Sequence, residues 1–331
     1  MSLVGVSDHI VRLRAWCAAV GPLPCRVAIT GETGTGKGLV ARLLHTHSGR
    51  KGPFVRRGTG ETASTLLQDD LFGHVRGAYT GATERRRGLL ETADGGTLFL
   101  DELQDLSMEG QRALLLFLDG HGFAPLGSDR RVQPEVRLIA AAQRPLGELV
   151  EEGLLRRDLL YRLRQATIGL RPLRERPEDV GPITAWVLRR HCARNPDGMG
   201  PRLSTRTLAL LERHPWPGNV RELENAVESA AFSAHGEETV EPEHLPEWFY
   251  EELGTGPRLG AVRESELEAA LRATSGNVEA AARRMGLSSK TVRRRVAFGG
   301  LNLAAIRGEG AEGARCGGRP DSADGGTNAA D

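Results

Sequence analysis

The feature that most constrains the fold is the stretch GETGTGKG at residues 31–38. An apolar run, CRVAIT at 25–30, precedes it, and an amphipathic run, GLVARLLHTH at 38–47, follows it. Such runs are typical of a short buried strand and of a helix, so the local order is strand, glycine loop, helix. Glycines let the loop curl until its backbone N–H groups point at an anion, and the helix adds its positive N-terminal end. The stretch therefore predicts a phosphate-binding loop.

Lys37 is the residue of this loop that would reach the β- and γ-phosphates of a nucleotide. At the next position, where a Ser or Thr hydroxyl usually binds Mg²⁺, the chain has Gly38. The alternative is a glycine-rich helix entry with an incidental lysine, and the strand–loop–helix context favours the nucleotide site. The predicted nucleotide-binding residues of the loop are Gly31, Glu32, Thr33, Gly34, Thr35, Gly36, Lys37 and Gly38.

A second strand candidate, GGTLFLDE at 95–102, ends in two carboxylates. Asp101 is predicted to hold Mg²⁺, directly or through water, and Glu102 to polarise an attacking water as a general base. An apolar run that ends in Asp-Glu is often only a strand entering a surface turn. Beside a phosphate-binding loop the catalytic interpretation is favoured, and the sequence then predicts ATP and Mg²⁺ as cofactors.

Periodicity divides the 331 residues into parts of different character. Strand candidates at 25–30, 96–101 and 136–142 alternate with helices, which indicates a parallel α/β sheet. Strand patterns stop near residue 170, and helices separated by Pro and Gly follow. The predicted parts are 1–170, an α/β nucleotide-binding subdomain; 171–250, a helical subdomain; 251–262, a linker; 263–298, a helix-turn-helix; and 299–331, a tail too poor in apolar residues to fold.

Net charge, apolar runs and cysteines indicate which partners and which cellular compartment to expect. The net charge is +1, so no global field attracts nucleic acid and any such site must be a local patch. No signal peptide is recognisable, and no apolar run approaches the ~20 residues of a membrane helix. The four cysteines (Cys17, Cys25, Cys192 and Cys316) form no C-x-x-C pair, which favours free thiols. A cytoplasmic protein without a membrane partner is expected.

The stretch GNVEAAARRMGLSSKTVRRRV at 276–296 is a helix-turn-helix candidate. Ala281 and Ala282 are small enough for two helices to cross closely, Gly286 permits the turn, and Ser288 or Ser289 can cap the second helix. The buried side is expected to contain Met285, Leu287, Val292 and Val296. The residues predicted to contact DNA are Ser289, Lys290, Thr291, Arg293, Arg294 and Arg295. The alternative is an ordinary helical hairpin with a solvated basic face.

Seven blocks in order carry a resemblance to a known family: GETGTGKG, LFGH (71–74), GAYTGA (77–82), GGTLFLDE, LRRDLLYRL (155–163), LRER (173–176) and WPGNVREL (216–223). Together they resemble the AAA+ domain of bacterial enhancer-binding proteins, the activators of sigma-54 RNA polymerase. The resemblance covers residues 3–297, and GAYTGA is its most specific element. It implies an AAA+ P-loop NTPase core with a parallel sheet, a helical lid subdomain and a small all-α Fis-type helix-turn-helix domain.

The resemblance also implies partners and further site residues. The family forms ring hexamers with ATP at each subunit boundary, and its Fis-type domains dimerise on palindromic enhancer DNA. Arg156 and Arg162 match trans-acting arginines, Arg221 matches the sensor arginine of the lid, and Gln143 lies at the first sensor position. On spacing alone, Arg156 and Arg162 would be interpreted as ordinary helix-surface arginines.

The GAYTGA stretch matches the loop with which the family contacts sigma-54. Its residues are Gly77, Ala78, Tyr79, Thr80, Gly81 and Ala82. The usual form has phenylalanine where this chain has Tyr79, which keeps the ring and adds a hydroxyl, so contact is expected to survive. A glycine-rich surface turn is the alternative interpretation.

Two further departures concern ATP turnover. The family commonly has asparagine at the position of Gly58, which restrains the catalytic glutamate, and glutamate at the position of Gly38. Less tightly gated or slower hydrolysis is therefore expected. The strand near residue 25 leaves no room for the usual N-terminal sensor domain, so either a separate regulatory protein acts on the chain or the chain is shortened.

Three functions remain to be compared. The leading hypothesis is an ATP-driven activator of sigma-54 RNA polymerase. The second is a DNA-bound regulator with weak or lost ATPase activity, which Gly38 and Gly58 motivate. The third is another AAA+ machine such as an unfoldase, which GAYTGA and the helix-turn-helix disfavour.

Overall fold

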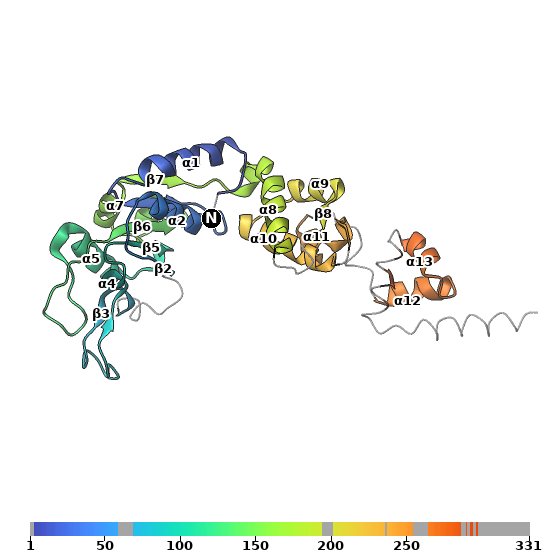
Figure 1. The fold of residues 1–331 in the computed structure, drawn as a ribbon. Helices are drawn as coiled ribbons and strands as arrows, with labels where there is room; N and C mark the ends of the chain where they lie inside the picture. Colours follow the sequence, from blue (N-terminus) through green and yellow to red (C-terminus); the bar gives the residue numbers. More distant parts are fainter. Residues whose placement is uncertain are drawn as a thin grey trace, which may run out of the picture. The chain divides into compact units, whose positions relative to one another are not determined.

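The computed structural model describes residues 3–58, 69–193, 201–235, 237–253 and 264–285, together with Ser289, Val292, Arg293 and Val296. Figure 1 labels the helices and strands along the chain. Contacts between residues divide the chain into two compact units, Met1–Leu245 and Pro246–Asp331. The predicted tail at 299–331 lies outside the described residues.

The first unit is built on a five-stranded parallel sheet in the order β2-β5-β6-β1-β7. All six residues of β6 are buried, as expected for a strand covered on both faces. Because the strands are parallel, their carboxyl ends meet at one edge of the sheet. The strands are β1 (Val27–Thr30), β2 (Phe54–Gly58), β5 (Thr97–Asp101), β6 (Arg137–Ala142) and β7 (Ala166–Gly169).

The sheet confirms the predicted α/β fold class and adds two strands that the sequence analysis did not name. Edge strand β2 reads FVRRG and is only half-buried, while β7 reads ATIG and alternates between half-buried and exposed. Neither forms the continuous apolar run that marks the three central strands.

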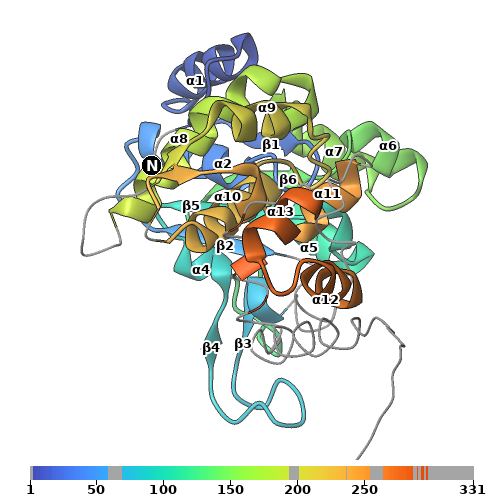
Figure 2. The same ribbon diagram turned by 90° about the vertical axis from the view of Figure 1, so that its right-hand side faces the viewer.

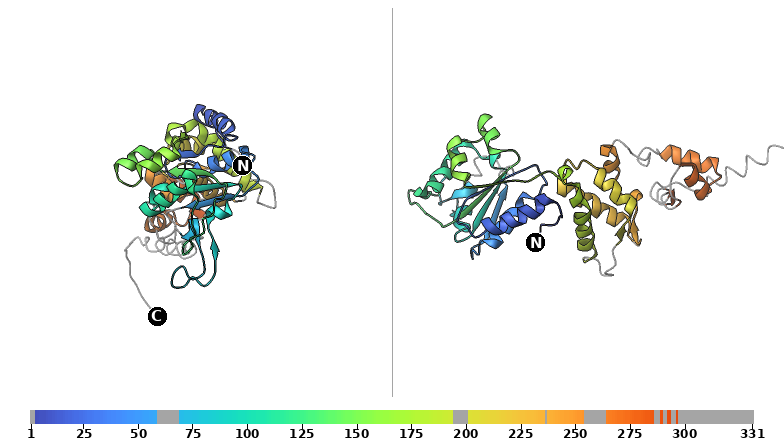
Figure 3. Two further views of the ribbon diagram at one scale, coloured as in Figure 1. Left: turned by 90° about the vertical axis from the view of Figure 1, so that its left-hand side faces the viewer. Right: turned by 90° about the horizontal axis from the view of Figure 1, so that it is seen from above.

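Helices cover both faces of the sheet, as the right-hand view of Figure 3 shows. On one face, Leu13 and Leu44 pack with Ile29 of the sheet. On the other face, Leu114 and Leu159 pack with sheet and loop residues such as Leu98. The helices of this subdomain are α1 (Asp8–Val20), α2 (Lys37–His47), α4 (Leu89–Thr92), η2 (Leu103–Asp105), α5 (Met108–Leu116), η3 (Phe117–His121), α6 (Leu146–Glu151) and α7 (Arg157–Leu163).

A short antiparallel pair, β3 (Gly73–His74) and β4 (Arg86–Arg87), carries the GAYTGA stretch in its connecting loop. Gly73 has φ +72°, and a Cβ there would lie 2.3 Å from the carbonyl oxygen of Arg86, so only glycine permits this pairing. Figure 2 shows the pair and its loop extending away from the sheet as a finger.

The remainder of the first unit is mainly helical, as predicted for the lid. Helices α8 (Val180–Cys192) and α10 (Asn219–Ser233) pack along each other, and Trp216 is buried with its indole N–H donating to the Leu211 carbonyl at 2.7 Å. The other helical elements are η4 (Leu173–Glu175), η5 (Pro177–Asp179), α9 (Thr205–Arg213) and η6 (Pro242–His244).

The expectation that strands end near residue 170 is wrong. Two later strands, β8 (Arg202–Leu203) and β9 (Thr239–Val240), pair in parallel over two residues each. Strands of this length are too short to show alternation in the sequence, and the lid positions them through its helices.

The second unit contains α11 (Glu247–Leu253), α12 (Glu264–Ala273) and α13 (Val278–Met285). The turn before α13 uses Ser275 and Gly276, with φ +49° and +73°, and the Asn277 side chain accepts from two N–H groups of the helix at 3.1 Å each. The core of the helix pair consists of Leu267, Ala270, Leu271, Ala281, Ala282, Val292 and Val296.

This core agrees with most of the predicted buried side. Ala281, Ala282, Val292 and Val296 are buried, and Met285 packs against them half-buried. Gly286, Leu287 and Ser288 lie outside the described residues. Ser289, Val292, Arg293 and Val296 are in helical conformation, consistent with a second helix of the motif.

The described residues also bear on the predicted free thiols and on the expected lack of a membrane helix. Cys17, Cys25 and Cys192 are free thiols, as predicted, and Cys316 lies outside that part. Among the helices of the described residues, none has the length and apolar character to cross a membrane.

Candidate functional site

The phosphate-binding loop joins β1 to α2 at the carboxyl edge of the sheet. Gly31, Gly34 and Gly36 have φ +146°, +80° and +105°, which L-residues rarely adopt. A Cβ at Gly34 would lie 2.0 Å from the carbonyl oxygen of Gly218, so the lid approaches this loop closely. The glycines thus serve both the curl of the loop and its contact with the lid.

Lys37 folds back over the loop and is almost fully buried. Its Nζ donates to the carbonyl oxygens of Gly31 at 2.7 Å and Glu32 at 3.1 Å. Burial lowers the pKa of Lys37, the Asp101 and Glu102 carboxylates oppose that shift, and the Arg221 charge adds to it. Lys37 begins α2, Asp101 ends β5 with Glu102 directly after it, and Arg221 Cβ is 3.3 Å from where a Cβ at Gly34 would lie. The central part of the predicted set therefore lies at one edge of the sheet.

Glu102 follows β5 in the left-handed region, with φ +62° and ψ +51°. A non-glycine residue in this region is uncommon, and such conformations persist where the surrounding structure enforces them. Gln143, which follows β6, donates from Nε2 to Oε1 of Glu102 at 3.3 Å. The predicted general base and the predicted first sensor are therefore hydrogen-bond partners.

Gly58 lies beside Asp101 in the register of β2 and β5. At this position it offers only backbone atoms to the carboxylate cluster. The family's usual asparagine would project from this point, so the structure places the departure within the site.

Arg56, which the sequence analysis did not single out, also belongs to this site. Its Nη2 donates to Oδ2 of Asp101 at 2.9 Å. The sequence indication was a charged residue two positions before Gly58, on a strand that the apolar pattern did not reveal. A contact between residues 45 positions apart depends on the β2–β5 register.

Lid residues contact the phosphate-binding loop directly. Asn219, with φ +56°, donates from Nδ2 to the Thr33 carbonyl at 3.0 Å and to Glu32 Oε2 at 3.2 Å. Arg174 binds both Glu32 oxygens, at 2.7 and 2.5 Å, and this hydrogen bonding lowers the pKa of Glu32. The backbone N–H of Val220 donates to the Gly34 carbonyl at 3.1 Å. Asn219 and Arg174 are site residues that spacing alone did not indicate.

Thr35 is hydrogen-bonded within the loop, and Gly38 is the second residue of α2. The Thr35 hydroxyl donates to the Glu32 carbonyl at 2.7 Å. The Arg221 side chain is exposed at the start of α10, one residue after the lid contact to Gly34. All eight predicted loop residues are therefore in the β1–α2 connection and the first turn of α2.

Arg156 and Arg162 lie at the two ends of α7 and pair with carboxylates of their own chain. Arg156 binds Asp158 through two hydrogen bonds of 3.0 and 2.7 Å, and Arg162 binds Asp119 at 2.7 Å. Both side chains are substantially exposed, at 37% and 54%. Neither joins the cluster around Lys37, so within one subunit they are surface arginines.

The GAYTGA loop is a tight turn held by its own backbone. Gly77 N–H donates to the Ala82 carbonyl at 2.8 Å, and Ala82 N–H donates to the Tyr79 carbonyl at 3.0 Å. Gly77 and Gly81 have φ +84° and +104°. The Tyr79 side chain is 47% exposed, and its ring meets the edge of the buried His74 ring at 5.2 Å.

A second segment supports the base of this loop. Leu126 accepts a hydrogen bond from Val75 N–H at 3.0 Å and donates to the Gly73 carbonyl at 2.9 Å. This segment follows α5 and η3, and α5 follows η2, which begins directly after Glu102. One continuous stretch of chain therefore connects the predicted general base to the base of the GAYTGA loop.

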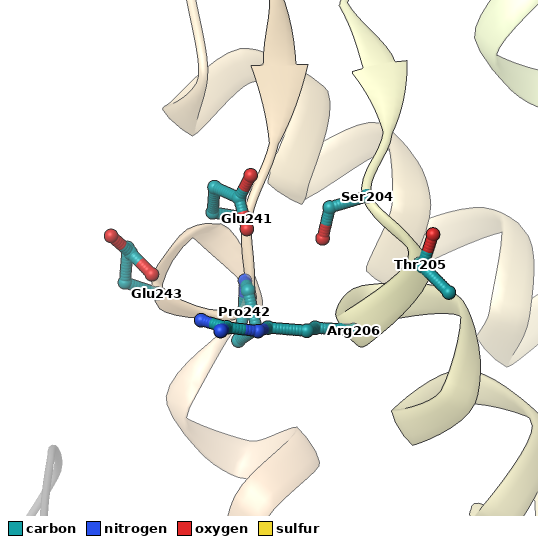
Figure 4. A pocket seen from close by; sticks show the side chains of 6 residues that line it. All are labelled: Ser204, Thr205, Arg206, Glu241, Pro242 and Glu243. Atoms are coloured by element: carbon teal, nitrogen blue, oxygen red, sulfur yellow. The ribbon is translucent and has the colours of Figure 1, made fainter.

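Two surface pockets lie apart from the Lys37 cluster. One is beside α7 and is lined by Arg156, Arg157, Asp158 and Tyr161. The other is in the lid, where Figure 4 shows the Arg206 side chain running past Pro242 towards Glu243. No residue of the lid pocket was predicted as a site residue.

Of the predicted DNA-contacting residues, Ser289 and Arg293 are described. Arg293 is exposed and lies 3.9 Å from a carboxylate oxygen of Glu279 on α13. Ser289 is half-buried. Lys290, Thr291, Arg294 and Arg295 lie outside the described residues.

The parallel sheet, the β1–α2 phosphate loop and the helical lid define the AAA+ class of P-loop NTPases. Three protein families match the chain in order: the sigma-54 interaction domain at residues 3–169, the AAA+ ATPase lid domain at 174–259 and the Fis family of bacterial regulatory proteins at 264–297. The chain belongs to the family of sigma-54-dependent transcriptional activators.

Similar proteins agree with this assignment. The transcriptional regulatory protein ZraR of Klebsiella oxytoca is 40% identical over 298 residues, which cover 88% of this chain and 67% of ZraR. The Nif-specific regulatory protein of Azospirillum brasilense is 42% identical over 230 residues, which cover 69% of this chain and 36% of that protein. The crystal structure of NtrX from Brucella abortus in complex with ADP superposes with a TM-score of 0.69 and 30% identity, covering 91% of this chain and 70% of NtrX.

Proposed function

We propose that the protein is an ATP-dependent activator of sigma-54 RNA polymerase. It binds enhancer DNA, assembles into a ring and uses ATP hydrolysis to remodel the closed promoter complex through its GAYTGA loop. The observation that carries this proposal is the gathering of Lys37, Asp101 and Glu102 at the sheet edge, with the GAYTGA finger in the same unit. The finger and the cluster are linked by the continuous chain from Glu102 to Leu126.

The residues at the sheet edge fit a magnesium nucleotide. Lys37 already binds two carbonyl oxygens of the loop, so its ammonium group is placed where a phosphate oxygen would compete for it. Asp101 supplies a carboxylate of the kind that Mg²⁺ prefers, while Gly38 supplies none. When bound, Mg²⁺ neutralises phosphate charge. A solved complex of the related NtrX with ATP supports the same ligand here.

Each proposed catalytic residue has a distinct task. Glu102 accepts the proton of the attacking water, and Gln143 orients that carboxylate through their hydrogen bond. Arg221 senses the nucleotide from the lid. Arg156 and Arg162 leave their own carboxylates in the ring and stabilise charge at the neighbouring subunit's site.

The GAYTGA residues transmit the result of hydrolysis. The exposed ring of Tyr79 and the Thr80 hydroxyl form the contact with sigma-54. A shift at Glu102 passes through η2, α5 and η3 to Leu126, whose two backbone hydrogen bonds hold the base of the loop.

Arg293 and its neighbours on the second helix of the Fis-type motif contact palindromic enhancer DNA. Dimerisation of that motif brings subunits together on DNA, and ring closure completes the ATP sites. The proposed compartment is the cytoplasm, where DNA and polymerase are found.

A second candidate function is a DNA-bound regulator with weak or lost ATPase activity. Gly38 and Gly58 favour it, because both remove a polar side chain from the site. In this case nucleotide serves only to assemble the ring.

The deciding experiment is ATP hydrolysis by the purified chain over a range of protein concentrations. Glu102→Ala removes the general base, and Glu148→Ala, which deletes an exposed carboxylate of α6, is the matched control. Specific activity that rises with concentration, disappears in Glu102→Ala and persists in Glu148→Ala supports a ring ATPase. Nucleotide binding without turnover, even with sigma-54 and enhancer DNA added, would favour the second function.

A further inference from the structure

Arg56 places a positive charge at the metal end of the proposed nucleotide site. Its Nη2 lies 2.9 Å from Oδ2 of Asp101, the carboxylate proposed to hold Mg²⁺. The guanidinium also lies over the Phe99 ring, with Cζ 5.9 Å from the ring centroid. The Arg56 side chain is 52% exposed and that of Asp101 is 15% exposed, so the arginine can leave the pair more easily than the carboxylate can move.

Gly38 leaves the space that this guanidinium occupies. A Cβ at residue 38 would lie 3.6 Å from Nη1 and 3.7 Å from Cζ of Arg56. These are ordinary contact distances, so residue 38 and the guanidinium are immediate neighbours. In most phosphate-binding loops a hydroxyl ligand of Mg²⁺ projects from this point. Arg56 therefore lies beside both positions that would supply metal ligands, residue 38 and Asp101.

A guanidinium at this place affects metal and phosphate in opposite ways. It has no acceptor atom and is positively charged, so it cannot bind Mg²⁺ and repels it. Its hydrogen bond occupies Oδ2, one of the two Asp101 oxygens that could bind the metal or its water. The same charge attracts the phosphates of a nucleotide that lacks Mg²⁺, because arginine matches phosphate oxygens well.

We propose that Arg56 is a positioning residue that holds Asp101 in the empty site, competes with Mg²⁺ for that carboxylate and makes nucleotide binding less dependent on Mg²⁺. The proposal deepens the proposed function and rests on nucleotide binding at this site. With Gly38 beside it, the Arg56 guanidinium places a fixed positive charge where other phosphate-binding loops have a metal ligand.

The test compares the affinity for a non-hydrolysable ATP analogue, AMP-PNP, in EDTA and in saturating MgCl₂. The measured quantity, obtained by calorimetry, is the dissociation constant in EDTA divided by the dissociation constant in MgCl₂. Arg56→Gln is expected to weaken binding in EDTA, to strengthen it in MgCl₂ and so to raise the ratio by up to about fivefold, since an exposed ion pair is worth up to ~1 kcal/mol. Arg56→Lys keeps the charge and is expected to keep the wild-type ratio.

Arg42→Gln is the matched control, because it removes an exposed arginine that lies over Phe54, on helix α2 beyond the loop. Its ratio is expected to stay at the wild-type value. Arg56→Met, which keeps a long unbranched side chain without the charge, serves for the same measurement if Arg56→Gln does not fold.

Three results overturn the inference. An unchanged ratio in Arg56→Gln, or an equal change in Arg42→Gln, rejects the role of Arg56 while wild-type nucleotide binding leaves the proposed function standing. Absence of AMP-PNP binding by the wild-type protein under both conditions rejects the inference and the proposed function together.

Discussion

Single residues in this protein are held in conformations that the site requires. Glu102 adopts φ +62° at the end of β5, and Asn219 adopts φ +56° at the start of α10. Left-handed backbone at a non-glycine residue costs of order ~1 kcal/mol, so each must be enforced by its surroundings. Gln143 contacts the first residue, and Glu32 and Thr33 contact the second. Glu102 therefore lies in the proposed nucleotide site, and Asn219 lies where the lid contacts the phosphate loop.

Gly58→Asn tests the gating of hydrolysis at the scale of one side chain. The new amide would project beside Asp101, the register partner of residue 58, and could hydrogen-bond the catalytic carboxylate. Basal ATP turnover is expected to fall about threefold to tenfold, because a hydrogen bond to a charged group is worth roughly 1.5 kcal/mol. Steady-state hydrolysis without sigma-54 measures this, and an unchanged rate would contradict the idea that Gly58 loosens the restraint.

Lys37 is expected to make nucleotide binding pH-dependent. Burial lowers its pKa below the ordinary 10.5, whereas bound phosphate stabilises the ammonium form and raises the pKa. The empty site therefore loses the proton first, and ATP affinity is expected to weaken as the pH rises through the empty-site pKa. The test is to measure dissociation constants for ATP from pH 8 upward, in steps of about one pH unit, with Lys51→Met as the control variant. Constant affinity up to pH 10.5 would show that the ammonium group makes no contact with phosphate.

At the scale of elements, parallel pairing explains why distant residues share one edge. β1 ends at the phosphate loop, β5 ends at Asp101 and β6 ends just before Gln143. The same logic places Arg56 near that edge, because β2 pairs with β5 in parallel register. The finger is different, since Leu126 rather than the sheet holds its base.

Glycines at strand junctions should be less replaceable than a glycine within a helix. A Cβ at Gly96 would lie 2.1 Å from the Pro53 carbonyl oxygen, a backbone atom that β2–β5 pairing holds in place, whereas Gly147 in α6 has nothing within 4 Å. Gly96→Ala is expected to lower the free energy of unfolding by about 2–4 kcal/mol. Gly147→Ala is expected to raise it by roughly 0.5–1 kcal/mol.

Urea denaturation of the two variants measures this difference. Equal stability of both would show that the junction at Gly96 can relax. A loss in Gly147→Ala would show that the open space beside α6 is used by another part of the molecule.

At the scale of the whole molecule, the role proposed for the α7 arginines depends on a neighbouring subunit. Within one subunit Arg156 binds Asp158 and Arg162 binds Asp119, away from the Lys37 cluster. A heterologous ring contact would carry them to the next subunit's nucleotide. Assembly then exchanges an ion pair with an exposed arginine for a contact with phosphate, and such surface pairs cost little to break.

Mixing two inactive variants tests this arrangement. Arg162→Ala keeps its own Glu102, and Glu102→Ala keeps its own arginines, so each alone is expected to be inactive. In an equimolar mixture about a quarter of the interfaces combine an intact glutamate with an intact arginine, and activity should recover to that extent. Mixed rings that form but hydrolyse no ATP would contradict action across the interface.

Much of the architecture follows from local sequence. The phosphate loop, β5, β6 and the core of the second unit were predictable, because continuous apolar runs, glycines and helical spacing act over a few residues. β2 and β7 were not, since polar residues interrupt one and the other alternates over four positions. The domain boundaries and the roles of Arg156, Arg162 and Arg221 stay predictions.

The sequence by itself determined the family, the nucleotide loop and the candidate catalytic residues, because each is encoded in contiguous residues with a set chemical task. Only the tertiary structure decided which residues meet across the chain. Arg56 meets Asp101 across 45 positions, Asn219 meets Glu32 across 187, and Leu126 meets the finger. Strand register creates the first contact, the packing of the lid against the phosphate loop the second, and backbone pairing beside β3 the third. All three are set by the packing of the whole core, to which no short stretch of sequence corresponds.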